Sequence, residues 1–229
     1  MIFGVNMNLN LLFQGLKKFG LGLIAIGILL FVPAGTLNYP NGWLFIALLF
    51  VPMLMVGIIL ITKAPDLFKK RLNANETQKE QKIVLLISLM MFVSSFIVAG
   101  VNFRFKLTQL QDIVVMVACV IFLIAYLMYM EVLRENEYLS RNVEVTENQK
   151  VIDTGLYGIV RHPMYTSTVF LFLSMPLILG SIYSFIIMLI YPIIIEFRIK
   201  NEEKILESEL EGYEEYKNKV KYKIFPFIW

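Results

Sequence analysis

Four long apolar runs occupy most of the first 130 residues of this chain. They cover residues 19–37, 42–62, 83–101 and 113–130. A helix needs about 20 apolar residues to cross the hydrocarbon core of a bilayer, so each run has roughly the length of one span. Charged residues make up only 17% of the chain, whereas they make up about 25% of a typical soluble domain. These features predict an all-α integral membrane protein that crosses the bilayer several times.

A fifth apolar region, residues 166–197, differs from the other four because it is interrupted. Pro176, Gly180, Ser181 and Pro192 divide it. Gly and Pro are the residues that most often end helices or form turns. We therefore expect a helical hairpin over residues 166–197, with a tight turn near Gly180.

The length of the chain suits one membrane domain covering residues 1–229. In this reading the four spans occupy residues 1–130, and a more polar portion that includes the hairpin occupies residues 131–229. The formal net charge of +3 is small and no basic stripe is present, so nucleic acid is not expected as a partner. The single cysteine, Cys119, lies in an apolar run and the single histidine is His162. With so few ligands of these types, no metal site is expected.

Lysine and arginine are distributed unevenly between the loops. Six lie in residues 63–82, four in residues 134–161 and seven in residues 198–223, whereas the loop between the first two runs has none. Cytoplasmic loops of membrane proteins carry an excess of these residues. We therefore predict that both termini and the polar portion face the cytoplasm.

A short polar motif, Arg161-His162-Pro163, precedes the hairpin. A residue before proline is biased away from the helical conformation, and proline is favoured as the first residue of a helix. The motif therefore predicts a helix that begins at Pro163, with its free backbone donors beside Arg161 and His162. Such a helix end suits an anion, for example a carboxylate. The alternative is that Arg161 and His162 only anchor the chain at the headgroup level.

A second polar cluster follows the hairpin. Arg198 and Glu202 are four residues apart and share one face of the expected helix, with Glu203 one step around it. The order Arg before Glu is the less favourable one for a pair within a helix, which suggests an external partner for these side chains. The alternative is an ordinary ion pair on a solvated surface.

Together these residues resemble the isoprenylcysteine carboxyl methyltransferase family. The resemblance rests on residues 151–165 with their RHPxY element, on Arg198 with the following Glu-Glu pair, and on the Gly-Tyr-x-x-Tyr stretch that begins at Gly212. It covers about the last hundred residues. The wider group includes the phospholipid N-methyltransferases. Where the family has glycine two places after the tyrosine of RHPxY, this chain has Ser167, a small residue in place of another.

The resemblance implies a multi-pass enzyme that holds S-adenosylmethionine in its C-terminal portion on the cytoplasmic side. It further implies a lipophilic or lipidated substrate that enters from the membrane lipids. By resemblance, Arg198 lies near the methyl-accepting group and Glu202 pairs with the amino group of the cofactor. The residues assigned to the cofactor site in this way are Gln149, Lys150, Val151, Ile152, Tyr157, Arg161, His162, Pro163, Met164, Tyr165, Glu202 and Glu203.

The chemistry of the cofactor is compatible with these residue types. S-adenosylmethionine carries an ammonium group, which suits a carboxylate side chain, and a sulfonium, which aromatic faces attract. An acceptor carboxylate needs no general base, and an arginine can orient it through two parallel hydrogen bonds. This favours carboxyl O-methylation of an isoprenylcysteine-like substrate.

Three alternatives remain open from the sequence. A lipid amine of the phospholipid type is the closest alternative acceptor. An NADPH-dependent sterol reductase of the membrane would share an Arg-His-Pro-like element, but its typical C-terminal features are missing here. A non-enzymatic transporter or assembly factor would explain the apolar runs but not the clustered polar residues.

Overall fold

The computed structural model describes residues 9–73, 79–140, 142 and 145–229, and the elements found in them are all helical. The expected all-α fold class is confirmed. In chain order the helices are α1 (Leu9–Ala34), α2 (Pro40–Lys63), α3 (Pro65–Leu72), α4 (Lys79–Phe105), α5 (Asp112–Glu135), a 3₁₀ turn η1 (Gly155–Gly158), α6 (Pro163–Ile178), α7 (Ile182–Met188), α8 (Tyr191–Glu209) and α9 (Tyr213–Lys219).

Within the described residues, five helical stretches are long and apolar enough to cross a membrane. Four are α1, α2, α4 and α5, which cover the predicted runs except residues 35–37 of the first, where α1 has already ended. The fifth joins α7 and α8 over residues 182–209. α1 begins ten residues before the predicted run and includes Lys17 and Lys18. A lysine can keep its charged end in water while its stem covers apolar surface, so these residues do not end a helix at the membrane boundary.

The interrupted region forms the predicted hairpin. α6 ends at Ile178, and Gly180 turns the chain in a left-handed backbone conformation at φ 77°. Ser181 then caps the N-terminus of α7, where its hydroxyl accepts a hydrogen bond from the Ser184 N–H at 3.2 Å. Pro192 lies in the first turn of α8, a position where a proline needs no backbone donor. The break between α7 and α8 therefore follows from the sequence.

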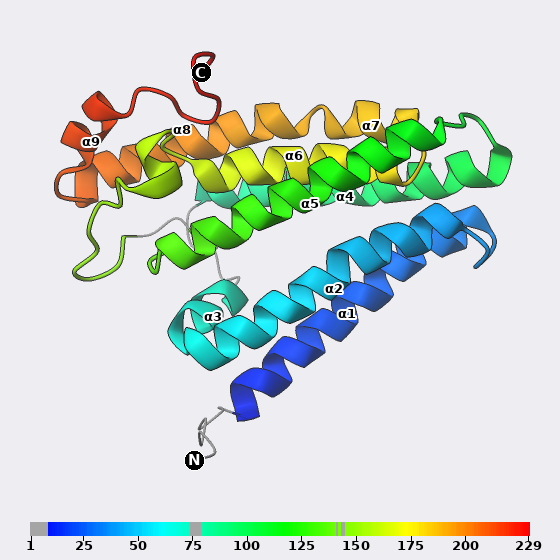
Figure 1. Cartoon of the computed structure of the whole chain (residues 1–229), viewed down its shortest axis with the longest axis horizontal. Coiled ribbons are helices and arrows are strands. Elements are labelled where there is room, and N and C mark those ends of the chain that lie inside the picture. The colour runs from blue at the N-terminus through cyan, green and yellow to red at the C-terminus, as the bar shows by residue number, and fades with distance from the viewer. Residues whose placement is uncertain (1–8, 74–78, 141, 143–144) are drawn as a thin grey trace.

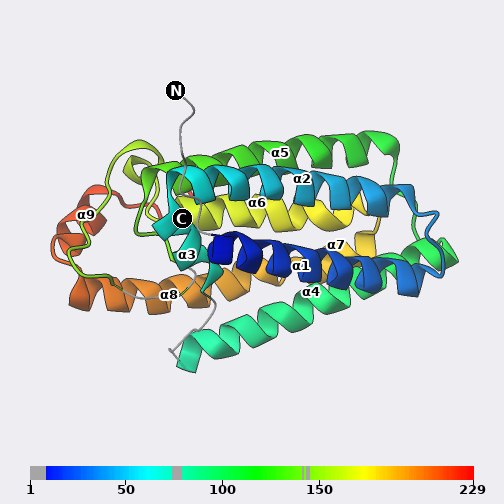
Figure 2. The ribbon, with the colours of Figure 1, turned by 90° about the horizontal axis from the view of Figure 1, so that it is seen from below.

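The helices form two unequal groups (Figure 1). In the larger group, α5 and α6 pack along each other, with α4, α7 and α8 beside them. The smaller group includes α1 and α2, which pack against each other. α1 also packs against α4 and so joins the two groups (Figure 2). The apolar core between the groups includes the fully buried Leu30, Phe45 and Phe122. At one end of the molecule, the end of α5, the start of α6, the end of α8 and α9 come together (Figure 1). This end carries the polar residues singled out from the sequence.

The C-terminal segment lies along the start of α6 and is held there by backbone hydrogen bonds. The Arg161 N–H donates to the Tyr222 carbonyl, and the His162 N–H donates to the Lys223 carbonyl, both at 2.9 Å. The Thr166 hydroxyl donates to the Ile224 carbonyl at 2.8 Å. The polar motif therefore positions the end of the chain as well as the start of a helix.

Candidate functional site

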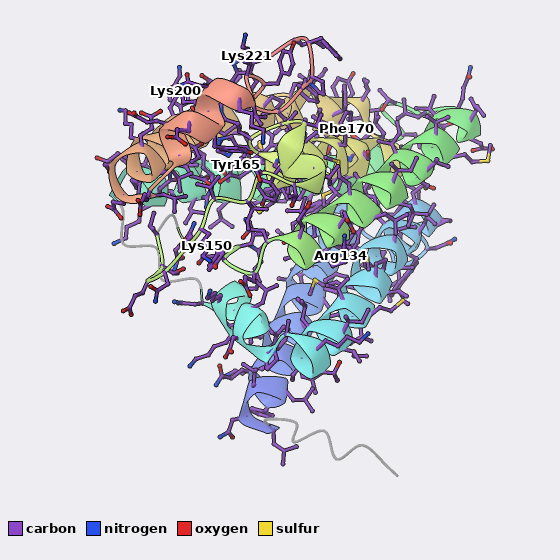
Figure 3. The ribbon with its side chains drawn as sticks, turned by 60° about the vertical axis from the view of Figure 1, so that its left-hand side comes forward. Arg134, Lys150, Tyr165, Phe170, Lys200 and Lys221 are labelled. Atoms are coloured by element: carbon purple, nitrogen blue, oxygen red, sulfur yellow. The ribbon has the colours of Figure 1, made fainter. Side chains whose placement is uncertain are left out.

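A cavity with a volume of about 110 Å³ lies where α5, α6, α8 and α9 meet. Pro163 and Glu203 do not line it, but all the other site residues predicted from the sequence do. These lining residues are Gln149, Lys150, Val151, Ile152, Tyr157, Arg161, His162, Met164, Tyr165, Arg198 and Glu202. Figure 3 shows Tyr165 between α8 and the loop that carries Lys150. The structure therefore brings these residues together, and the role of each remains a prediction.

The start of α6 has the predicted backbone but offers fewer donors than expected. His162 is non-helical, with φ −124° and ψ 63°, and Pro163 is the first helical residue. However, the N–H groups of Tyr165 and Thr166 both donate to the His162 carbonyl, at 3.0 and 3.1 Å. The bond from Thr166 is the ordinary first hydrogen bond of a helix capped by His162. The expectation of free donors at this helix end is therefore wrong for the Tyr165 N–H, which the His162 carbonyl already accepts.

Arg161 is buried and joins three parts of the protein through its hydrogen bonds. Its Nε donates to Glu203 Oε1 at 2.8 Å, and its Nη1 donates to the Val220 and Lys221 carbonyls, each at 2.8 Å. Only 6% of Arg161 is exposed. The alternative of an exposed headgroup anchor is therefore wrong for Arg161. Its guanidinium joins α6, α8 and the C-terminal segment.

Glu203 lies behind the cavity rather than on its wall. Besides Arg161, its Oε1 lies 3.2 Å from Nε2 of His162, and its Oε2 lies 3.8 Å from the Lys223 ammonium. A buried carboxylate needs such partners, since an unpaired buried charge is strongly unfavourable. These contacts favour a supporting role for Glu203 beneath His162 and Arg161.

Arg198, Tyr165 and Glu202 form a chain of hydrogen bonds on the cavity wall. The Tyr165 hydroxyl accepts a hydrogen bond from Arg198 Nε at 2.8 Å and donates one to Glu202 Oε2 at 2.5 Å. The other oxygen of Glu202 is 4.0 Å from His162 Nδ1. Arg198 and Glu202 share one face of α8, as predicted. That face meets Tyr165 of α6 and lines the cavity, so the two residues are not an isolated pair on a solvated surface.

The opposite wall is a loop fastened to the end of α5. Glu135 accepts hydrogen bonds from the Thr154 hydroxyl at 2.9 Å and from the Leu156 N–H at 3.2 Å. Gly155 has a left-handed backbone, with φ 51°, and a Cβ there would lie 2.2 Å from Glu135 Oε1. A larger residue would therefore strain the backbone and displace the Glu135 carboxylate. The Tyr157 hydroxyl accepts a hydrogen bond from Asn136 at 2.9 Å, and burial raises the pKa of Tyr157 above its ordinary value. These contacts fix the loop against the bundle.

Several cavity residues were not assigned to the site from the sequence. They are Asn136, Tyr138, Leu139, Ser140, Asn142, Ile205, Leu206, Leu210, Tyr213 and Tyr216. Tyr213 and Tyr216 are three residues apart on α9, a spacing that places both on one helix face. That spacing is a signal that could have identified them. The Tyr216 hydroxyl donates to the Tyr157 carbonyl at 2.8 Å, so α9 also supports the loop.

Comparison with known proteins gives one family for the part of the chain that builds most of this cavity. The model of the phospholipid methyltransferase family matches residues 110–211, from just before α5 to just before α9. His162, Arg198 and Glu202 all lie within the match. A search of curated proteins found no match. Residues 110–211 of this multi-pass membrane protein are therefore similar to the phospholipid methyltransferases, which belong to the wider group that the sequence resembles.

Proposed function

We propose that this protein transfers a methyl group from S-adenosylmethionine to a lipophilic substrate at the membrane surface. The observation that carries the proposal is the cavity itself, which places Glu202, Arg198 and five tyrosines around one space. The match to a methyltransferase family supports the reaction class. A transporter or assembly factor would leave this arrangement without a purpose.

The residues present fit the groups of S-adenosylmethionine. Glu202 offers a carboxylate to the ammonium group, and the rings of Tyr138, Tyr157 and Tyr165 offer aromatic faces to the sulfonium. The hydroxyl of Tyr213 is a buried donor without a partner among the described residues, and it matches the acceptor groups of this molecule. The loop 149–152 supplies amide and apolar contacts for a nucleoside.

The same features fit NADPH less well. A dinucleotide phosphate needs several free donors or arginines for its phosphate groups. Arg161 is engaged by Glu203 and two carbonyls, and at the start of α6 Pro163 has no N–H and the Tyr165 N–H is already bonded. We therefore favour a methyltransferase over the reductase alternative.

The proposed chemistry depends on alignment of the two reactants. S-adenosylmethionine supplies an electrophilic methyl group on its sulfonium. Tyr165 fixes Arg198 and Glu202 relative to each other, which sets the distance between the substrate end and the ammonium end of the cavity. Positioning of this kind, together with exclusion of water by the tyrosines, supplies much of the rate in a displacement that needs no proton transfer.

We further propose that the acceptor is a carboxylate of an isoprenylcysteine-like substrate, oriented by Arg198. Two parallel hydrogen bonds from the guanidinium would hold its oxygens, and an ionised carboxylate is already a nucleophile. The second candidate is a lipid amine, which the description of the matched family favours. The two products separate chemically, because base hydrolyses a methyl ester and releases labelled methanol, whereas an N-methyl amine keeps the label.

We propose that the cavity and both termini face the cytoplasm, as the basic loops predict. Single cysteines at Asn38 and Glu214, in a Cys119→Ser background, should then react with an impermeant reagent from opposite sides of sealed membranes. Both residues are exposed, and Glu214 lies on α9 beside the cavity. Cytoplasmic labelling at Glu214 is expected. Labelling of both positions from one side would overturn this topology.

Replacing Glu202 with glutamine is expected to weaken binding of S-adenosylhomocysteine, the product form of the cofactor. The loss should be about 1.5 to 3 kcal/mol, because a charged hydrogen bond to the ammonium becomes a neutral one. Isothermal titration calorimetry on detergent-solubilised protein measures this change. The matched control is Glu209→Gln, which alters an exposed carboxylate on the same helix that does not line the cavity. Equal affinity in wild type and Glu202→Gln would remove Glu202 from the ammonium site.

A further inference from the structure

We propose that the Tyr213 hydroxyl donates a hydrogen bond to the carboxylate at the amino-acid end of bound S-adenosylmethionine. This inference rests on the proposed function. Tyr213 lies on α9, outside the segment matched by the family model, and lines the cavity.

The first observation is that the Tyr213 hydroxyl is buried and makes no hydrogen bond within the part of the chain that the structure describes. Only 4% of the residue is exposed, and its oxygen has no hydrogen-bond partner among the described residues. The neighbouring tyrosines of the cavity are satisfied: Tyr157 accepts from Asn136, Tyr165 contacts Arg198 and Glu202, and Tyr216 donates to a carbonyl. A buried hydroxyl that makes no hydrogen bond is unfavourable. A ligand in the cavity would supply the missing acceptor.

The second observation is that Tyr213 is a neutral donor in an acidic setting. Burial raises the pKa of Tyr213 well above its ordinary value, and the charges of Glu203 and Glu202 raise it further. The phenol therefore keeps its proton at neutral pH. The phenol interacts electrostatically with Glu202, the residue that we assign to the ammonium group. In an amino acid the carboxylate and the ammonium are attached to the same carbon, so a donor on the wall of the cavity that Glu202 also lines suits the carboxylate.

The third observation concerns the donors that could otherwise bind this carboxylate. The N–H groups of Tyr165 and Thr166 are bonded to the His162 carbonyl, and the Arg161 guanidinium is bonded to Glu203, Val220 and Lys221. The Tyr165 N–H and three hydrogen bonds of the Arg161 guanidinium are therefore already in use. Tyr213 adds a donor from α9 on the wall of the same cavity.

The test compares two ligands with wild-type protein and Tyr213→Phe. S-adenosylhomocysteine has the amino-acid end, and 5′-methylthioadenosine lacks it. Tyr213→Phe should bind S-adenosylhomocysteine roughly tenfold to hundredfold more weakly, the usual effect of losing a hydrogen bond to a charged group. It should bind 5′-methylthioadenosine with wild-type affinity. Equal affinity for S-adenosylhomocysteine, or the same loss for both ligands, would overturn the inference.

Thermal unfolding without ligand separates this role from a structural one. Because the Tyr213 hydroxyl has no hydrogen-bond partner among the described residues, Tyr213→Phe should unfold at the wild-type temperature or slightly above it. The matched control is Tyr216→Phe, which removes the 2.8 Å hydrogen bond to the Tyr157 carbonyl and should lower the unfolding temperature by roughly 2 to 4 °C. A lowered unfolding temperature for Tyr213→Phe would contradict the inference.

The outcomes also distinguish this inference from the proposed function. If wild-type protein binds S-adenosylhomocysteine and Tyr213→Phe binds it equally well, only the role of Tyr213 fails. If wild-type protein binds neither ligand, the proposed cofactor fails, and the role of Tyr213 fails with it.

Discussion

Replacing Arg198 with lysine is expected to reduce methyl transfer by one to several orders of magnitude while leaving cofactor affinity close to wild type. Lysine keeps the positive charge but cannot form the planar two-point contact of a guanidinium with a carboxylate. Loss of about 2 to 4 kcal/mol of positioning in the transition state gives a decrease of this size. The hydrogen bond from Arg198 Nε to Tyr165 would also be weakened, which adds to the loss of alignment.

The measurement is transfer of a labelled methyl group from S-adenosylmethionine into a lipid extract, with calorimetry on the same preparation. The matched control is Arg134→Lys, because Arg134 also makes a two-point contact, with Glu131, but is exposed. That variant should turn over at the wild-type rate. Wild-type turnover in Arg198→Lys would remove Arg198 from the substrate site, and loss of cofactor binding would assign it to the cofactor instead.

Replacing Arg161 with alanine is expected to destabilise the folded protein by about 3 to 5 kcal/mol. The change removes one partner of a buried ion pair and leaves Glu203 without its closest cation. It also leaves the Val220 and Lys221 carbonyls without their donor. The C-terminal segment would then keep its backbone bonds, the bond from Thr166 and the packing of Ile224 and Phe225 against α6. This effect differs from that of the cavity variants, which should leave the fold intact.

Thermal unfolding of the detergent-solubilised protein measures the effect of Arg161→Ala, and a decrease of roughly 5 °C or more is expected. Arg134→Ala is the control, since it breaks an exposed ion pair, and such pairs contribute at most about 1 kcal/mol. An unfolding temperature for Arg161→Ala as high as that of the control would show that the buried contacts of Arg161 do not stabilise the fold.

The features that the sequence predicted well are those that depend on neighbouring residues. The length of each apolar run indicates a span. Gly180 lies at the turn of the hairpin and Pro192 lies in the first turn of α8. Both effects depend on local backbone preferences and not on distant parts of the chain. The helix that begins at Pro163 is predictable for the same reason. The early start of α1 is not, because hydropathy detects the bilayer core and misses the polar turns that extend beyond it.

The site was predictable as a set of residues but less so in its contacts. The spacing of Arg198 and Glu202 places them on one helix face, and only the fold shows that Tyr165 from another helix joins them. The contacts of Arg161 reach carbonyls about 60 residues further along the chain. Pairings at such separations leave no periodic signal in the sequence. The Tyr213 hydroxyl, which has no hydrogen-bond partner among the described residues, likewise becomes visible only in the folded structure.

Calorimetric titration of the wild-type protein with S-adenosylmethionine and with NADPH tests the identity of the cofactor most directly. The detergent-solubilised chain is titrated with each compound in turn, under the same conditions. Binding of S-adenosylmethionine at one site per chain, with no heat from NADPH, is the expected result. Binding of NADPH without binding of S-adenosylmethionine would contradict the proposed methyltransferase and favour a reductase.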